Sequence, residues 1–179
     1  MEINSICIFC GSSFGTNPVF KTTAEHIGKT FAGKNITLVY GGGNVGLMGV
    51  VSNSVMQNGG KVIGVIPNFM TEKELADYGV TELLMVETMH ERKKKMSDIA
   101  DAFIAIAGGI GTLDELFEIF TWRQLNLHNK PIGLLNTEGY YDSMLAFLNT
   151  MVTNGFLKQE TLDLLIVRDN IEDLIDALK

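Results

Sequence analysis

Short apolar runs recur along the chain and alternate with helical patterns, and this alternation restricts the possible folds more than any other feature. Most of the runs are continuously apolar, as at residues 102–106. Continuous runs are typical of strands that are buried on both faces, as in a parallel sheet covered by helices. The predicted strands are residues 6–9, 37–40, 62–66, 83–86, 102–106, 132–135 and 164–167.

Segments with helical periodicity lie between these runs. One helix opens at Asn17 and Pro18, with Asn17 as its N-cap and Pro18 in the first helical position. The alternation predicts an α/β protein with a Rossmann-like, doubly wound, mostly parallel sheet flanked by helices. The 179 residues suit a single nucleotide-binding domain over residues 1–179. The other predicted helices are residues 46–58, 89–100, 112–127, 141–154 and 171–178.

The charge balance and the apolar runs limit the partners that we expect. A formal net charge of −7 argues against a nucleic-acid partner, which needs a basic surface. The apolar runs are too short to span a bilayer, so we expect no membrane contact. The first four residues lack the basic start of a signal peptide, and we therefore expect a cytoplasmic protein.

The two cysteines, Cys7 and Cys10, have C-x-x-C spacing, which is also found in redox and metal sites. A structural zinc site needs four ligands, and no second Cys/His pair of suitable spacing follows. We interpret both residues as part of a buried strand and expect no metal and no other cofactor.

Three predicted strands end in turns of small residues, at 10–13, 41–46 and 108–112. Ligands bind at the carboxyl ends of the strands in such sheets, and glycine lets the backbone approach a ligand closely. Amides at a helix N-terminus also favour an anion, so the turns predict a phosphate-binding site. The NAD fingerprint is incomplete because strand 62–66 runs into Pro67 without the acidic residue that would bind the ribose.

Three Thr-x-x-Glu units, at 71–74, 88–91 and 112–115, match the capping box, in which Thr caps the helix and Glu reaches back to the cap. Each glutamate therefore has a structural explanation. Glu115 also lies one turn into the helix that follows the third glycine turn, beside the place where a ribose phosphate would bind. Both a capping role and a catalytic role remain open for it.

The predicted helix at 89–100 has a charged residue on its apolar side. Arg92 falls within or beside the apolar stripe and Lys93 on its other edge, whereas Lys94 and Lys95 point to solvent. An inward guanidinium needs an anionic or hydrogen-bonding partner, for which Glu115 and a ligand are the candidates. His90 is expected to be exposed, and none of the three histidines is expected to be catalytic. The stripe is formed by Met89, Met96, Ile99 and Ala100.

Two segments resemble motifs of a known family. Residues 89–93 read Met-His-Glu-Arg-Lys, and residues 107–115 read Ala-Gly-Gly-Ile-Gly-Thr-Leu-Asp-Glu. They are similar to the Met-His-x-Arg-Lys and Pro-Gly-Gly-x-Gly-Thr-x-x-Glu motifs of the Lonely Guy (LOG) family of cytokinin-activating phosphoribohydrolases. Further similarity at 9–13, 41–49, 121–125 and 130–136 extends over nearly the whole chain. Ala107 departs from the motif, where the family has proline.

The resemblance implies hydrolysis of the N-glycosidic bond of N6-substituted adenosine 5′-monophosphates, giving a free base and ribose 5-phosphate. Adenosine monophosphate (AMP) also fits this substrate class, and the family implies a homodimer. Arg92 and Glu115 are implied to carry catalysis. Together with residues of the first two glycine turns, the predicted substrate-binding set is Ser12, Gly43, Gly46, Glu74, Met89, Arg92, Lys93, Gly109, Ile110, Gly111, Thr112, Leu113, Asp114, Glu115 and Thr121.

Two other functions fit parts of the same pattern. A non-catalytic carrier of a nucleotide or of molybdenum cofactor needs the phosphate-binding turns but no glutamate over the ribose. A nicotinamide-dependent oxidoreductase needs the ribose-binding acid that is missing here. A lysine decarboxylase is not expected, because the chain contains no recognisable pyridoxal phosphate site.

Overall fold

The computed structural model describes residues 2–71 and 76–179, and a seven-stranded sheet forms its centre. The strand order is β4-β3-β2-β1-β5-β6-β7, and all neighbouring strands are parallel. The seven predicted strands and the Rossmann-like parallel sheet are confirmed, with ends that differ by at most one residue. The strands are β1 Ser5–Phe9, β2 Thr37–Tyr40, β3 Val62–Pro67, β4 Glu82–Val86, β5 Ala102–Ala105, β6 Ile132–Leu135 and β7 Leu165–Arg168.

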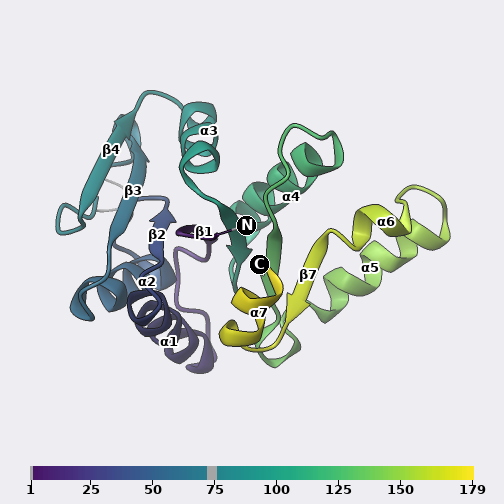
Figure 1. The fold of residues 1–179 in the computed structure, drawn as a ribbon, viewed down its shortest axis with the longest axis horizontal. Helices are drawn as coiled ribbons and strands as arrows, with labels where there is room; N and C mark the ends of the chain where they lie inside the picture. The colour runs from purple at the N-terminus through teal and green to yellow at the C-terminus, as the bar shows by residue number, and fades with distance from the viewer. Residues whose placement is uncertain (1, 72–75) are drawn as a thin grey trace.

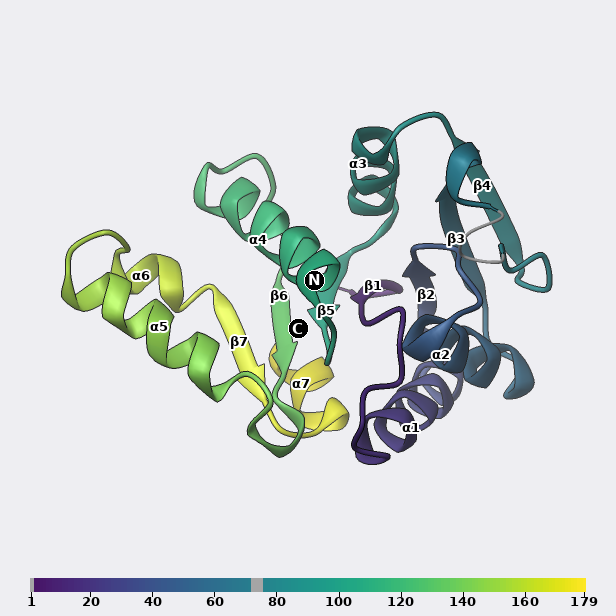
Figure 2. The same cartoon turned by 180° about the vertical axis from the view of Figure 1, so that it is seen from behind.

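Helices cover both faces of this sheet (Figures 1 and 2). Ile6 and Ile8 of β1 face one hydrophobic core, whereas Cys7 and Phe9 face the other, because side chains alternate along a strand. The first core is closed by α1 (Val19–Gly33), α2 (Gly46–Gln57) and α7 (Ile171–Ala177). The second is closed by α3 (Met89–Ile99), α4 (Ile110–Gln124) and α5 (Asp142–Thr153).

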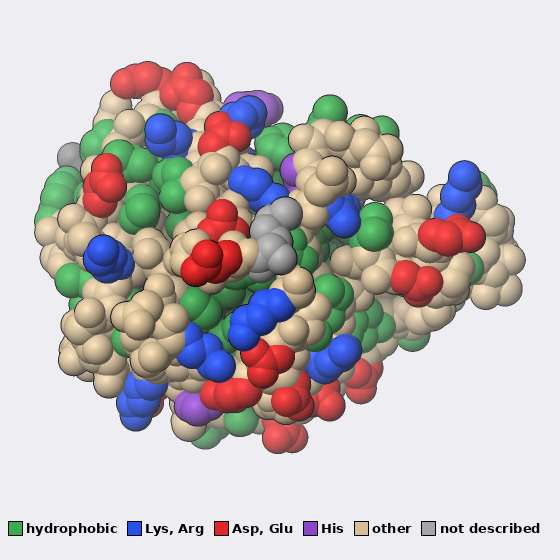
Figure 3. Space-filling model, viewed as in Figure 1, with side chains coloured by type: hydrophobic (Ala, Val, Ile, Leu, Met, Phe, Trp, Pro, Cys, Tyr) green, Lys and Arg blue, Asp and Glu red, His purple; other side chains and the backbone are tan. Residues whose placement is uncertain are grey.

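Three short elements complete the fold. They are the 3₁₀ turns η1 (Asn68–Met70) and η2 (Thr137–Gly139) and the helix α6 (Gln159–Leu162). The sequence pattern did not predict α6, because four residues are too few to show a helical period. No helix in the described part of the chain is both long and apolar enough to cross a membrane. Acidic and basic side chains are interspersed over the face shown in Figure 3.

Both cysteines are buried and carry free thiols. Cys7 lies within β1 and Cys10 directly after it, and they pack into opposite cores. The expected burial is therefore confirmed for both cysteines, but only Cys7 is part of the strand, since β1 ends at Phe9.

The helix starts differ from the predicted capping boxes. α4 begins at Ile110 after an extended Gly109 and has no side-chain cap, so the prediction that Thr112 caps a helix was wrong. Glycine permits this uncapped start, and Thr112 lies buried inside the first turn. The second box is half formed: Thr88 Oγ1 accepts from the Glu91 amide at 3.1 Å, but the Glu91 carboxylate accepts from the Glu87 amide. The box at 71–74 lies mostly outside the described residues.

The start of α1 also differs, by one residue. The helix begins at Val19, so Pro18 occupies the N-cap position that was predicted for Asn17. Asn17 still satisfies a backbone amide of the helix start, because its Oδ1 accepts from the Val19 amide at 3.0 Å.

The three glycine turns meet at the carboxyl ends of the central strands. The Gly11 amide donates to the Ala107 carbonyl at 3.1 Å, and the Leu47 amide donates to the Gly11 carbonyl at 3.0 Å. Gly46 has a φ of 54°, and a Cβ on it would overlap the peptide that joins Ser12 to Ser13. The turns therefore pack backbone against backbone. Ala107 contributes a carbonyl, which a proline at this position would also provide.

Two glycines of α1 give a matched test of helix packing. A Cβ on Gly28 would overlap Ser54 and lie 2.8 Å from the Val55 amide nitrogen of α2, whereas a Cβ on Gly33 would meet nothing within 4 Å. We expect Gly28→Ala to lower the free energy of unfolding by about 1–3 kcal/mol, because α2 must move away. We expect Gly33→Ala to raise it by up to about 1 kcal/mol through helix propensity. Urea unfolding followed by circular dichroism measures both, and equal stability of the two variants would refute this packing.

Candidate active site

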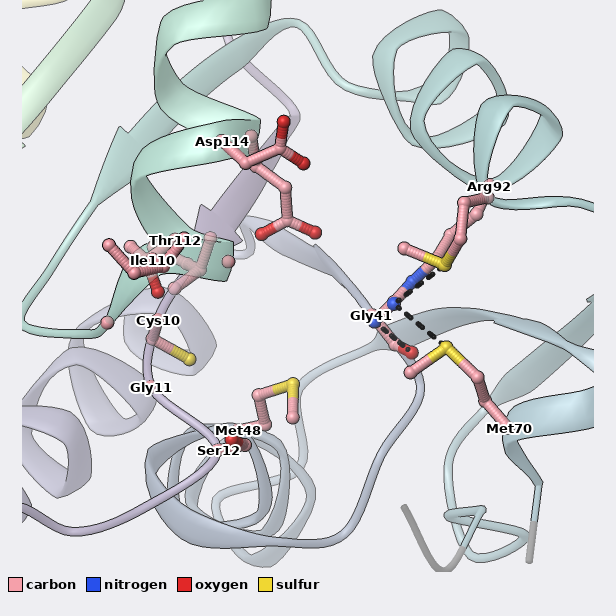
Figure 4. Close-up of a pocket in the computed structure, with 15 residues that line it drawn as sticks. Cys10, Gly11, Ser12, Gly41, Met48, Met70, Arg92, Ile110, Thr112 and Asp114 are labelled. Carbon is pink, nitrogen blue, oxygen red and sulfur yellow. Dashed lines mark hydrogen bonds between the residues drawn. The ribbon is translucent and has the colours of Figure 1, made fainter. Parts of the chain in front are cut away.

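A cavity of about 280 Å³ lies at the carboxyl ends of the central strands. One wall comes from α3 and η1, and the opposite wall from the first turn of α4 (Figure 4). The turn after β1 and the start of α2 form its floor. This is the place at which ligands bind in doubly wound sheets, beside the point where the chain crosses from one half of the sheet to the other.

Much of the predicted substrate-binding set lines this cavity, and its members come from the turn after β1 and from α3 and α4. Sequence-distant motifs therefore meet at one site. The predicted residues in the lining are Ser12, Met89, Arg92, Gly109, Ile110, Gly111, Thr112, Asp114 and Glu115.

The other predicted residues in the described ranges are not part of the lining. Gly43 forms a β-bridge with Ala76, and Gly46 packs against the turn after β1. Leu113 and Thr121 face a separate groove along α4. Lys93 instead forms ion pairs with α4. Glu74 lies outside the described residues.

Several lining residues were not in the predicted set. Gly41 opens the second glycine turn, so its position after a strand was a signal that could have identified it. Met48 lies in the segment 41–49 that resembles the family, but nothing in the sequence indicated that its side chain reaches the site. Met70 gave no signal, because an isolated methionine has no motif and reaches the site only through the packing of η1. The additional lining residues are Ile8, Cys10, Gly11, Gly41, Met48 and Met70.

Arg92 projects from α3 into the cavity wall and is only 4% exposed, so the prediction that it points inward is confirmed. Its Nη2 donates to the Gly41 carbonyl at 2.9 Å, and its Nη1 lies 3.7 Å from Met70 Sδ and 3.8 Å from Met89 Sδ. A Cβ on Gly41 would overlap the guanidinium, so only glycine leaves room for this bond. Lys94 and Lys95 are exposed, as predicted.

The first turn of α4 forms the opposite wall. The first amides of any helix have no acceptor within the helix, and the helix dipole adds partial positive charge there. A Cβ on Gly109 or Gly111 would meet nothing within 4 Å. Packing within the described chain therefore does not require these two glycines, and both line the cavity. This end of the cavity suits a phosphate group.

Glu115 is half-buried one turn along the same helix. Burial, and next the negative charge of Glu115, raises the pKa of Cys10 well above the usual thiol range. Cys10 is therefore a neutral thiol in the cavity floor and not a nucleophile. Arg92 and Glu115 thus reach the same cavity from opposite walls, one cationic and one anionic.

Other reactive side chains lie elsewhere. His26 contacts Glu172 at 2.9 Å, His128 contacts the Ile119 carbonyl at 3.0 Å, and His90 is exposed, as predicted. Within residues 2–71 and 76–179, no group of three His, Cys, Asp or Glu side chains could hold a metal ion. None of the described lining residues is a lysine, so this part of the cavity offers no amine for a Schiff base.

Solved structures with the same fold include two proteins associated with molybdenum cofactor. The molybdenum cofactor binding protein of Rippkaea orientalis superposes with a TM-score of 0.72 at 21% identity, over 99% of this chain and 96% of that one. The Moco carrier protein of Chlamydomonas reinhardtii gives 0.73 at 19% identity, over 98% and 95%. Identities this low establish the fold alone.

Sequence similarity to curated proteins is much higher. Cytokinin riboside 5′-monophosphate phosphoribohydrolase LOG1 of Arabidopsis thaliana is 44% identical over all of this chain and 86% of its own length. LOG4 of the same plant is 45% identical over 99% of this chain and 83% of its own length. A family model described as "possible lysine decarboxylase" matches residues 48–178. The chain therefore belongs to the LOG family of cytokinin riboside 5′-monophosphate phosphoribohydrolases.

Proposed function

We propose that this protein cleaves the N-glycosidic bond of N6-substituted adenosine 5′-monophosphates, and of AMP, to release the base and ribose 5-phosphate. The observation that carries the proposal is that Arg92 and Glu115 line one cavity together with the first turn of α4. A carrier of the same fold would need the phosphate-binding turn but no carboxylate at the ribose. The names of the curated relatives support the same reaction.

The α4 end of the cavity binds the 5′-phosphate in this proposal. The amides of Ile110, Gly111 and Thr112 face the anion, and the dipole of the fifteen-residue helix favours its charge. Binding the phosphate orients the ribose, so that binding energy from a remote group lowers the barrier at C1′.

Glu115 acts at the ribose. When the bond from C1′ to the base breaks, its electron pair leaves with the base and positive charge develops on the ribose. The Glu115 carboxylate stabilises this charge and accepts a proton from the water whose oxygen attacks C1′. The base gains a proton as it departs, which completes the hydrolysis.

Arg92 supplies the positive charge of the site. Its guanidinium is fixed by the Gly41 carbonyl, so the cation is positioned before substrate arrives. From there it orients Glu115 or the substrate and stabilises the electron pair on the departing base. Met48, Met70 and Met89 provide polarisable apolar surface in the same cavity, which suits contact with a flat aromatic base.

The role of Glu115 is tested by Glu115→Gln, which keeps the shape of the side chain and removes its charge. We expect kcat for base release from AMP to fall by about 10²–10⁴-fold, the usual contribution of a general base. Chromatography of released base measures this, and calorimetry checks that AMP still binds. Glu160→Gln on the exposed helix α6 is the matched control. Release by Glu115→Gln at the wild-type rate would exclude this role, and AMP binding by the wild-type protein without base release would favour a carrier.

The role of Arg92 gives a second prediction, which uses the glycine that it contacts. Arg92→Ala should lower kcat/KM by about 10²-fold or more, because a preorganised charge is lost. Gly41→Ala should lower it in the same direction, because the new Cβ takes the place of the guanidinium. Gly33→Ala, where a Cβ has room, should keep wild-type activity. Full activity of Gly41→Ala would contradict the proposed position of Arg92.

We also propose that the protein is a homodimer that works in the cytoplasm, where charged nucleotides are retained. The support for a dimer is an apolar groove along α4, lined by Ile110, Leu113, Phe117 and Trp122. Ile110 is 83% exposed although it is large and apolar, which is typical of an interaction surface.

The dimer is tested by sedimentation of the wild type and of Phe117→Glu, which places a charge in the groove. We expect a dimer for the wild type and a monomer for the variant. Phe147→Glu, at an exposed position on α5, is the matched control and should remain dimeric. A monomeric wild-type protein at micromolar concentration would refute the proposal.

A further inference from the structure

Lys93 connects the two walls of the cavity. It extends from α3, and its Nζ lies 2.7 Å from Asp114 Oδ2 and 3.3 Å from Glu118 Oε2 of α4. The Lys93 side chain is only 15% exposed and Glu118 is 25% exposed, so water screens this pair less than a surface pair, whereas Asp114 is 57% exposed. Burial lowers the pKa of Lys93, but the two carboxylates outweigh this effect and raise the pKa above its usual value.

The members of this ion pair are the sequence neighbours of the two proposed catalytic residues. Lys93 follows Arg92 on α3, and Asp114 precedes Glu115 on α4. Consecutive residues belong to the same rigid helix, about 1.5 Å apart along its axis, so an ion pair that holds α3 against α4 also limits how far Arg92 and Glu115 can move apart. Lys93 itself does not line the cavity among the described residues.

We propose that Lys93 is a positioning residue, and that its ion pairs with Asp114 and Glu118 set the separation between Arg92 and Glu115. This inference rests on the proposed function of the same site. It gives Lys93 a different role from the substrate contact that the family resemblance implies. In this proposal the nucleotide contacts Arg92 and the first turn of α4. Lys93 does not touch the nucleotide and acts by holding α3 against α4.

Glu118 gives an independent reason for this role. Its Oε2 is buried, and Lys93 Nζ at 3.3 Å is the cation that balances its charge, although the Glu118 side chain as a whole is 25% exposed. Removal of the lysine leaves the buried oxygen of this partly exposed carboxylate without its cation, which is unfavourable. Glu118 must then turn toward solvent, and α4 loses its ion pairs with α3. A displacement of about 1 Å in a catalytic geometry can cost about 10²-fold in rate.

The experiment is a double-mutant cycle of Lys93→Met and Glu118→Gln, with Lys93→Arg as the conservative variant. Lys94→Met is the matched control, because Lys94 is exposed and pairs with Asp98 on its own helix. The measurements are kcat and KM for AMP, together with calorimetric affinity for ribose 5-phosphate.

A positioning role predicts that Lys93→Met lowers kcat by about 10- to 100-fold and changes KM and ribose 5-phosphate affinity by less than about 3-fold. Lys93→Arg should restore most of kcat, and the double variant should be no slower than the slower single variant. If KM instead rises by about 10-fold or more while kcat is unchanged, or if the two substitutions act independently, Lys93 does not position the walls and the proposal is overturned.

The same variants separate this inference from the proposed function. If the wild-type protein releases no base, the proposed hydrolysis is wrong. The effect of each substitution, alone and combined, is then measured as the change in the urea concentration at the midpoint of unfolding. Non-additive effects of Lys93→Met and Glu118→Gln on that midpoint support an ion pair that links α3 to α4, whereas additive effects refute it.

Discussion

The backbone contact between the turns after β1 and β5 is the constraint on which the site depends. The Gly11 amide donates to the Ala107 carbonyl, and the next turn is joined to Gly11 through the Leu47 amide. A Cβ on Gly108 would overlap both Thr112 and the Gly11 backbone. Small residues are therefore required for the turns to meet, and this contact sets where α4 and α2 begin. The first turn of α4 lines the cavity as a result.

The charges of the site are arranged in two pairs across this framework. α3 contributes Arg92 and Lys93, and α4 contributes Asp114 and Glu115. Arg92, Glu115 and Asp114 line the cavity, and Asp114 also makes a 2.7 Å ion pair with Lys93, which lies outside the lining. A buried cation is costly unless it has a partner, and both cations have one, since Arg92 uses the Gly41 carbonyl and Lys93 uses carboxylates. The proposed chemistry and the proposed support thus come from consecutive residues.

Local patterns predicted much of the fold. The strands were predicted because continuous apolar runs between polar segments report burial on both faces. Arg92 was predicted to point inward because helical period alone assigns it to the apolar stripe. The start of α4 was placed too late, because the Thr112 capping pattern competed with a glycine start that has no side-chain signal. Met70 was missed because it belongs to no motif, and Met48 because its place in the segment 41–49 does not show which way its side chain points.

The sequence alone determined the parallel α/β architecture, the glycine turns at strand ends and the inward face of Arg92. All three follow from local periodicity and from the backbone freedom of glycine. Tertiary structure decided which turns meet and that the Gly41 carbonyl accepts a hydrogen bond from Arg92. It also decided that Lys93 forms ion pairs with α4 and does not line the cavity. These contacts join residues that are distant in sequence, and their distances depend on how strands and helices pack. No local pattern encodes that packing, so only the folded chain gives the geometry of the site.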